Sequence, residues 1–124
     1  MHDVDQLFAD FTDALRRGDC EALADLVTED AEFWSHGVAS MKGREHVRTA
    51  MRQACEQYLV ERSWEEIERV GGDDFMVSVG IERTRATPRA GGDAVEVVQR
   101  GWTMARRGAD GRWRFTRGIT NREG

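Results

Sequence analysis

The residues best suited to chemistry follow one another near the end of a short apolar segment, at Trp34, Ser35 and His36. A histidine can give or take a proton near neutral pH, so His36 is a candidate general acid or base for a bound carbonyl compound. The alternative is that His36 points outward or caps the following loop, because one step along a strand reverses the side-chain direction. Both alternatives stay open from the sequence.

Aromatic side chains form a second group of candidates, since this chain of 124 residues contains four tryptophans. Trp34 and Trp102 either line a pocket for a flat apolar ligand or pack in the core and at a dimer interface. For Trp64 and Trp113 we predict ordinary packing. Asn121 ends the last predicted strand, where its amide either orients a ligand carbonyl or caps the terminus.

Charged residues within the predicted strands form a third group. Glu82 lies next to Arg83, and Glu96, Arg100 and Arg117 lie on neighbouring segments. These groups could converge in a cavity as an acid and an electrophilic clamp. The alternative is a set of cross-strand ion pairs on a solvated or interface face, each worth about 1 kcal/mol or less.

Three helices are predicted in the first half of the chain. A helix over residues 3–17 is predicted because its apolar residues recur at three- and four-residue steps, at Val4, Leu7, Phe8, Phe11 and Leu15. Gly18 suits the end of this helix, and Asp19 can cap a second, shorter one. The third helix is predicted over residues 44–58, with Tyr58 at the end of its buried stripe.

The rest of the chain is predicted to be strand. A first strand over residues 31–36 follows a turn at Glu29 and Asp30. Four more strands follow the third helix, over residues 62–70, 75–86, 95–107 and 112–121, and the imperfect alternation of the first of them indicates a bulge. We predict an α+β fold, in which a curved antiparallel sheet wraps around three N-terminal helices as a cone and leaves a cavity at its open end.

Composition and charge narrow the class of partner. A hydrophobic content of 40% is typical of a soluble globular protein, and we predict one domain over residues 1–124. The net charge of −5 argues against nucleic acid, and no segment is long and apolar enough to span a membrane. Cys20 and Cys55, far apart in sequence, fit a reduced cytoplasmic protein without a signal peptide. The sequence predicts no metal site and no cofactor, because the histidines lack ligand spacing and no nucleotide-binding motif is found.

Several segments resemble the SnoaL-like superfamily, the cone-shaped fold shared by ketosteroid isomerases and nuclear transport factor two. They are Phe11-Thr-Asp-Ala-Leu-Arg-Arg-Gly-Asp19, Leu26-Val-Thr-Glu-Asp-Ala-Glu-Phe33 and Lys42-Gly-Arg-Glu-His-Val47. Residues 99–104 and 110–115 are similar to the small bacterial SgcJ/EcaC-type members. The resemblance covers essentially the whole chain, and it implies a homodimer built on the sheet. Because this fold hosts isomerases, dehydratases, cyclases, epoxide hydrolases and binding modules, it does not imply one activity.

The positions that ketosteroid isomerases use for catalysis carry different residues in this chain. The resemblance places their aspartate base at Ser35, their oxyanion tyrosine at Phe11 and their oxyanion aspartic acid near Thr103. A serine does not take a proton from carbon at neutral pH, and phenylalanine has no donor. We therefore do not expect ketosteroid isomerase activity.

Two hypotheses remain open. The first is a small-molecule-binding protein that acts as a cofactor-independent isomerase, cyclase or dehydratase on an apolar or polyketide-like compound. Its candidate catalytic residues are His36 and Ser35, and its candidate ligand-binding residues are Trp34, Phe11, Tyr58, Arg100, Trp102, Thr103 and Asn121. The second is a non-catalytic binding or dimerisation module with a closed cavity. A cavity of roughly 300 Å³ or more would favour the first.

Overall fold

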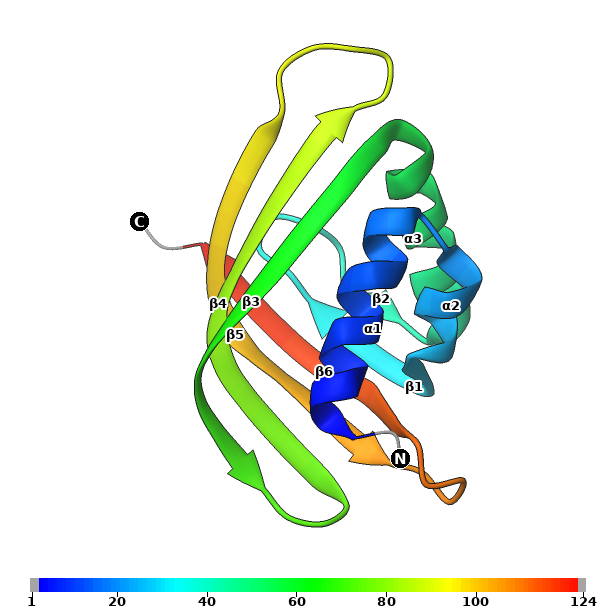
Figure 1. Ribbon diagram of the computed structural model, residues 1–124, viewed down its shortest axis with the longest axis vertical. Coiled ribbons are helices and arrows are strands. Elements are labelled where there is room, and N and C mark those ends of the chain that lie inside the picture. Colours follow the sequence, from blue (N-terminus) through cyan, green and yellow to red (C-terminus); the bar gives the residue numbers. More distant parts are fainter. Residues whose placement is uncertain (1–2, 123–124) are drawn as a thin grey trace.

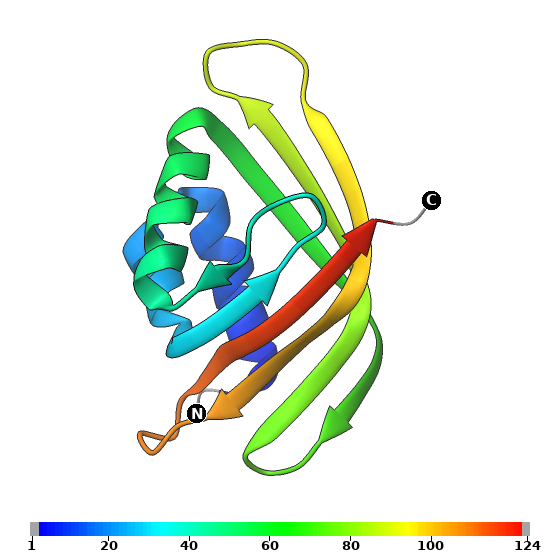
Figure 2. The same cartoon turned by 180° about the vertical axis from the view of Figure 1, so that it is seen from behind.

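The computed structural model describes residues 3–122 as three helices and six strands (Figure 1). In chain order the elements are α1 (Val4–Arg17), α2 (Cys20–Asp25), β1 (Val27–Trp34), β2 (Met41–Lys42), α3 (Arg44–Gln57), β3 (Tyr58–Gly71), β4 (Phe75–Pro88), β5 (Val95–Arg107) and β6 (Trp113–Arg122). The predicted α+β cone is confirmed, because the sheet curves around the helices (Figures 1 and 2). No helix within residues 3–122 has the length and hydropathy needed to cross a membrane.

The helix ends follow the capping residues of the sequence. The Asp3 carboxylate accepts a hydrogen bond from the backbone N–H of Gln6 at 2.8 Å, and Gly18 ends α1 with a φ of 69°. Asp19 caps α2 in the same way, accepting from the backbone N–H of Ala22 at 3.0 Å. The predicted boundaries of α1 are confirmed to within a residue, and α3 ends at Gln57, one residue earlier than predicted.

The sheet has the strand order β2-β1-β6-β5-β4-β3 (Figure 2). Strands β3 to β6 form the predicted antiparallel meander. Strand β1 instead runs parallel to β6, which brings the first strand of the chain beside the last. The predicted bulge is confirmed, because the register between β3 and β4 shifts between Glu66 and Glu68.

Three predictions about β1 are wrong. The strand begins at Val27, not at residue 31, and it runs through Glu29 and Asp30 where a turn was expected. The register between β1 and β6 shifts between Val27 and Glu32. Glu29 and Asp30 lie at this irregularity, and their side chains are exposed. The strand also ends at Trp34, and the segment after it holds the short strand β2, which pairs back onto β1. Strand β3 likewise starts at Tyr58, directly after α3, rather than at residue 62.

Glycines allow the strands to bend sharply where the sheet wraps the helices. Gly80 on β4 and Gly101 on β5 face each other in register. A Cβ at Gly80 would lie 2.3 Å from the carbonyl oxygen of Glu65, and one at Gly101 would lie 1.9 Å from that of Ile119. Because no side chain fits such contacts, only glycine permits this curvature.

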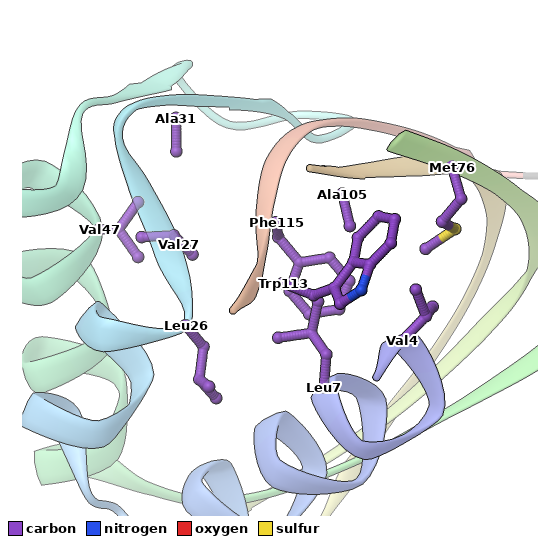
Figure 3. Close-up of a cluster of buried hydrophobic side chains, with 10 residues drawn as sticks. All are labelled: Val4, Leu7, Leu26, Val27, Ala31, Val47, Met76, Ala105, Trp113 and Phe115. Atoms are coloured by element: carbon purple, nitrogen blue, oxygen red, sulfur yellow. The ribbon is translucent and has the colours of Figure 1, made fainter. Parts of the chain in front are cut away.

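The core fills the part of the cone near the start of α1 (Figure 3). Its buried residues are Val4, Leu7, Leu26, Val27, Ala31, Val47, Met76, Ala105, Trp113 and Phe115. The packing prediction for Trp113 is confirmed, since its exposed fraction is 9%. On β4 the buried positions are Met76, Ser78 and Gly80, so the intervening valines face the outer side of the sheet.

Candidate functional site

A cavity of about 230 Å³ lies between the helices and the concave face of the sheet. Its walls are mostly apolar and come from both layers of the fold. The main apolar lining residues are Phe8, Phe11, Leu15, Phe33, Met51, Ala54, Val60, Trp64 and Phe115. The helices contribute their buried stripes, and the strands contribute the alternate residues that point to the inner face.

An ion pair stands in this apolar wall. Nη2 of Arg62 on β3 lies 2.7 Å from Oε2 of Glu82 on β4, and the two side chains are only 26% and 18% exposed. The hydroxyl of Thr84 donates to the other carboxylate oxygen, Oε1, at 3.1 Å. The Arg62 guanidinium also lies over the ring of Phe11, 5.0 Å from its centroid. The pair is therefore held from three sides by β3, β4 and α1.

This arrangement combines a proton acceptor with a cation in one place. An ionised carboxylate has more acceptor sites than the two that Arg62 and Thr84 occupy. Glu82 can therefore still accept a proton or a hydrogen bond from a ligand. A guanidinium has several N–H donors and can bind an oxygen that becomes negative. Apolar walls reduce screening, which strengthens both interactions relative to water.

A buried hydroxyl on β6 offers a further polar contact. Thr120 lines the cavity, and within residues 3–122 its Oγ1 is buried without a hydrogen-bond partner. Its neighbour in the lining, Thr103, donates instead to the carbonyl oxygen of Arg117 at 3.3 Å. A buried hydroxyl without a partner lowers stability, so the Thr120 hydroxyl is available to a ligand.

Five of the predicted site residues line the cavity: Phe11, Trp34, Ser35, Trp102 and Thr103. Phe11, Ser35 and Thr103 are the residues that the resemblance placed at the catalytic positions of ketosteroid isomerases, so the structure brings those positions together around one space.

Trp34 and Trp102 lie at the border of the cavity but belong to the outer face of the sheet. Consecutive strand residues point to opposite faces, so only one of Phe33 and Trp34 can direct its side chain inward. Phe33 is the inward one, because its ring lies against Gly118 on the inner face. Trp34 is 47% exposed, and its indole N–H donates to Glu32, on the same outer side. Trp102 pairs in register with Ile119, as Trp34 does, and belongs to that outer face too.

The other predicted site residues lie away from the cavity. His36 has an exposed side chain, and its Nδ1 lies 3.0 Å from Oδ1 of Asn121. Within residues 3–122, the cavity lining does not include four of the predicted site residues, namely His36, Tyr58, Arg100 and Asn121. Because β1 ends at Trp34, His36 is in a loop beside the end of β6 and not on the inner face. Their roles stay predictions, without support from the geometry of the cavity.

Sequence reasoning missed Arg62, Thr84 and Thr120. The sequence indicates Glu82 as one of several charges within strands, together with Arg83, but it does not identify Arg62 as its partner. The available signal was the alternation on each strand, with Val60, Arg62 and Trp64 on one face of β3. The pairing of Arg62 with Glu82 depends on a register that a bulge displaces, and sequence alone does not give that register.

Comparison with known proteins decides the family. The model of the SnoaL-like domain matches residues 8–116. The chain belongs to the SnoaL-like domain family. The finer assignment to the SgcJ/EcaC type stays a prediction. The search of curated proteins gave no match.

Several solved structures share this fold. A ketosteroid isomerase-like protein from Erwinia carotovora atroseptica SCRI1043 aligns with a TM-score of 0.80 at 18% identity, over 98% of this chain and 94% of the other. A conserved protein from Planctomyces limnophilus DSM 3776 aligns with a TM-score of 0.85 at 22% identity, over 97% and 94%. A protein from Novosphingobium aromaticivorans DSM 12444, provisionally named a scytalone dehydratase, aligns with a TM-score of 0.86 at 14% identity, over 98% and 82%. At these identities the likeness concerns the fold alone.

Proposed function

We propose that this SnoaL-like protein binds a small, mostly apolar compound in its cone, and that Glu82 and Arg62 carry out acid–base chemistry on it. The observation that carries the proposal is the Arg62–Glu82 ion pair in the wall of an otherwise apolar cavity. Replacement of such a charged pair by apolar residues is often neutral or stabilising, so the presence of the pair here supports a role in binding a ligand or in fixing the register. The unpartnered Thr120 hydroxyl adds a second polar contact for a ligand.

The size of the cavity limits the ligand. Its volume of about 230 Å³ does not reach the roughly 300 Å³ that we set from the sequence as favouring a small-molecule-binding protein, and at which drug-sized pockets begin. A dry cavity of roughly 150 Å³ holds benzene. The space therefore suits a compound of one ring with short substituents, and it does not favour the polycyclic or polyketide-like ligand expected from the sequence.

Proton transfer within a carbonyl compound is the chemistry that the two side chains suit. The Glu82 carboxylate would take a proton from the carbon beside the carbonyl, and Arg62 would bind the oxygen as it becomes negative. Return of that proton to a different carbon gives an isomerisation. Its delivery to a departing hydroxyl gives a dehydration with loss of water. Neither step requires an oxidant or a reductant, in keeping with the predicted lack of a cofactor. A dehydratase name among the structural neighbours agrees with this class.

A ligand screen tests this proposal. A panel of single-ring ketones, enones and hydroxyketones is added to the protein, and the melting temperature is measured. We expect some of them to raise it, and we expect Glu82→Gln to abolish the exchange of ligand carbon-bound hydrogen with deuterated water. The proposal is wrong if no compound raises the melting temperature, or if exchange by Glu82→Gln equals that of the wild type.

A homodimer is a second proposal, which rests on the outer face of the sheet. Trp34, Ile119, Trp102 and Val79 lie in register across β1, β6, β5 and β4 on that face. Trp34 is 47% exposed there, and Ile67 on β3 is 66% exposed. A row of apolar residues across four strands is typical of a face that another molecule covers. A second copy of this chain is the partner that the superfamily resemblance implies.

Sedimentation velocity at micromolar concentration tests the dimer. We expect the wild type to sediment as a dimer and Val79→Glu, which places a charge in the apolar row, to sediment as a folded monomer. Arg85→Glu, on the same strand beyond the row, is the control and should stay dimeric. A wild type that sediments as a monomer would contradict the proposal.

A further inference from the structure

The helical layer brings together the only two cysteines of the sequence, which the sequence interpretation had treated as distant. Cys20 is the first residue of α2, and Cys55 lies in the last turn of α3. The two helices lie side by side on the outside of the cone (Figure 1). Cys20 and Cys55 are therefore far apart in sequence but lie on neighbouring helices.

The two thiols lie in the same part of the helical layer. Cys55 is buried in an apolar cluster with Ala14, Leu15 and Leu23, and Cys20 packs against that cluster. The Cys20 thiol donates a hydrogen bond to the carbonyl oxygen of Gly18 at 3.7 Å. Cys20 also contributes to the raised pKa of the Cys55 thiol, after the larger effect of burial. The backbone of the α1–α2 corner also lies against Cys55, since a Cβ at Gly18 would be 3.8 Å from the Cys55 Cβ.

We propose that Cys20 and Cys55 form a reversible disulfide that links α2 to α3, so that the pair is a site of oxidative modification. Both thiols belong to one packed layer, and a disulfide between them requires a Cβ–Cβ separation of about 4 Å. The bond would close the loop formed by α2, β1, β2 and most of α3. In a reducing compartment such a bond is transient and responds to oxidants.

The reaction is a thiol–disulfide exchange with a low-molecular-weight disulfide such as oxidised glutathione. Cys20 is the half-buried thiol and Cys55 the buried one, so the Cys20 thiolate attacks first and releases one glutathione thiolate. The Cys55 thiolate then attacks the sulfur of Cys20 and releases the second. Burial raises the pKa of the Cys55 thiol, which suits it to the later, intramolecular step. In total two protein thiols are oxidised and one glutathione disulfide is reduced to two thiols, which take up the two protons.

The bond would act on the wall of the candidate cavity. Leu15 belongs to the cysteine cluster, Met51 packs against it, and both line the cavity. A covalent link between α2 and α3 would hold this wall in place. Oxidation should therefore stabilise the fold rather than open it.

The folded protein is incubated with oxidised glutathione without denaturant, digested with trypsin and analysed by mass spectrometry. We expect the peptide of residues 18–42 to be linked to that of residues 53–62, with a loss of about 2 Da relative to the separate thiols. The melting temperature should rise by roughly 10 °C and return on reduction. Cys20→Ser should show no link and no rise.

Three outcomes would overturn the proposal. The first is a stable mixed disulfide on Cys20 with Cys55 still free. The second is a link between two chains instead of within one. The third is an intramolecular link that forms only in denaturant or lowers the melting temperature. Cys55→Ala serves as the second variant, because it replaces the buried thiol with a small apolar group and must also lose the link while remaining folded.

Discussion

Two acid–arginine pairs stand on strand β3 and its neighbour β4, and their surroundings differ. Towards the β3–β4 turn, Glu66 pairs with Arg69 at 2.9 Å and accepts from the hydroxyl of Ser78 at 2.6 Å. Ser78 is fully buried and in turn accepts from the indole N–H of Trp64 at 2.8 Å. Farther along the same strands, Arg62 and Glu82 face the cavity.

The difference teaches how one pattern of residues serves two purposes. Around Ser78 the polar partners are protein groups, the Trp64 indole and the Glu66 carboxylate, so that network holds the curved hairpin in register. Around Glu82 the same chemistry borders about 230 Å³ of space. We infer that the Glu66 network is structural and that the Arg62–Glu82 pair is functional.

The largest expected effect is on chemistry. Glu82→Gln should lower the rate of ligand hydrogen exchange by about 100-fold or more, because a positioned general base contributes at least that much. Glu66→Gln, the same change at the other pair, should leave the rate within about twofold. The rates are measured by NMR in deuterated water with a compound from the screen. Equal losses in both variants would remove the distinction between the two pairs.

For stability, we expect the larger effect in the Glu66 network and the smaller one beside Glu82. Ser78→Ala removes the acceptor of the half-buried Trp64 indole, and it should lower the free energy of unfolding by about 1–3 kcal/mol. Thr84→Val removes only a donor to Glu82, which keeps Arg62, and should cost less than about 1 kcal/mol. Urea unfolding followed by tryptophan fluorescence measures both. A larger loss for Thr84→Val would contradict the assignment of roles.

Thr120 provides a test of ligand binding in the cavity that is separate from the Arg62–Glu82 pair. Since its buried hydroxyl has no partner within residues 3–122, Thr120→Val should not lower the free energy of unfolding and should raise it by up to about 1 kcal/mol. It should weaken the binding of a compound from the screen by roughly tenfold, as expected for one lost hydrogen bond. Isothermal titration calorimetry measures the affinity. Unchanged affinity would show that the hydroxyl does not contact the ligand.

The smallest effect concerns an exposed pair at the β5–β6 turn. Hydrogen bonds from the Arg114 guanidinium, and then from the backbone N–H of Arg112, lower the pKa of Asp110 to about 2. A lowered carboxyl pKa stabilises the fold above the ordinary value of 3.8, and this contribution is lost as the pH falls towards 2. Asp110→Asn should therefore show a shallower fall of melting temperature between about pH 4 and pH 2. Asp93→Asn, in the β4–β5 loop, is the control, and its melting temperature should fall as steeply as that of the wild type. If the melting temperature of Asp110→Asn falls as steeply as that of the wild type, the Asp110 carboxylate is not the origin of the effect.

Much of the fold follows from local patterns in the sequence. The stripe of α1 between Asp3 and Gly18 specifies that helix, and the capping carboxylate of Asp19 specifies the next. The bulge in β3 is visible as broken alternation. Strand β1 is harder to predict, because Glu29 and Asp30 look like a turn although they lie within the strand, where the register between β1 and β6 shifts. The pairing of β1 with β6 joins the first strand of the chain to the last.

The candidate site follows from the sequence only in part. Phe11, Ser35 and Thr103 reach the cavity as the resemblance implies. His36 does not, because β1 stops before it and the side chain meets Asn121 at the surface. Arg62 and Glu82 meet only through the register of two long strands that also contain the bulge. Local periodicity carries no information on that register, so the pair was not predictable.

The most direct test of the account is a map of ligand-induced chemical-shift changes in ¹⁵N-labelled protein, recorded with a single-ring carbonyl compound from the screen. We predict that the changes gather at Arg62, Glu82, Thr84 and Thr120, while the signals of Glu66, Arg69 and Ser78 stay unmoved. Changes centred on the Ser78 network, or on the outer face around Trp102, would contradict the claim that the Arg62–Glu82 cavity is the functional site.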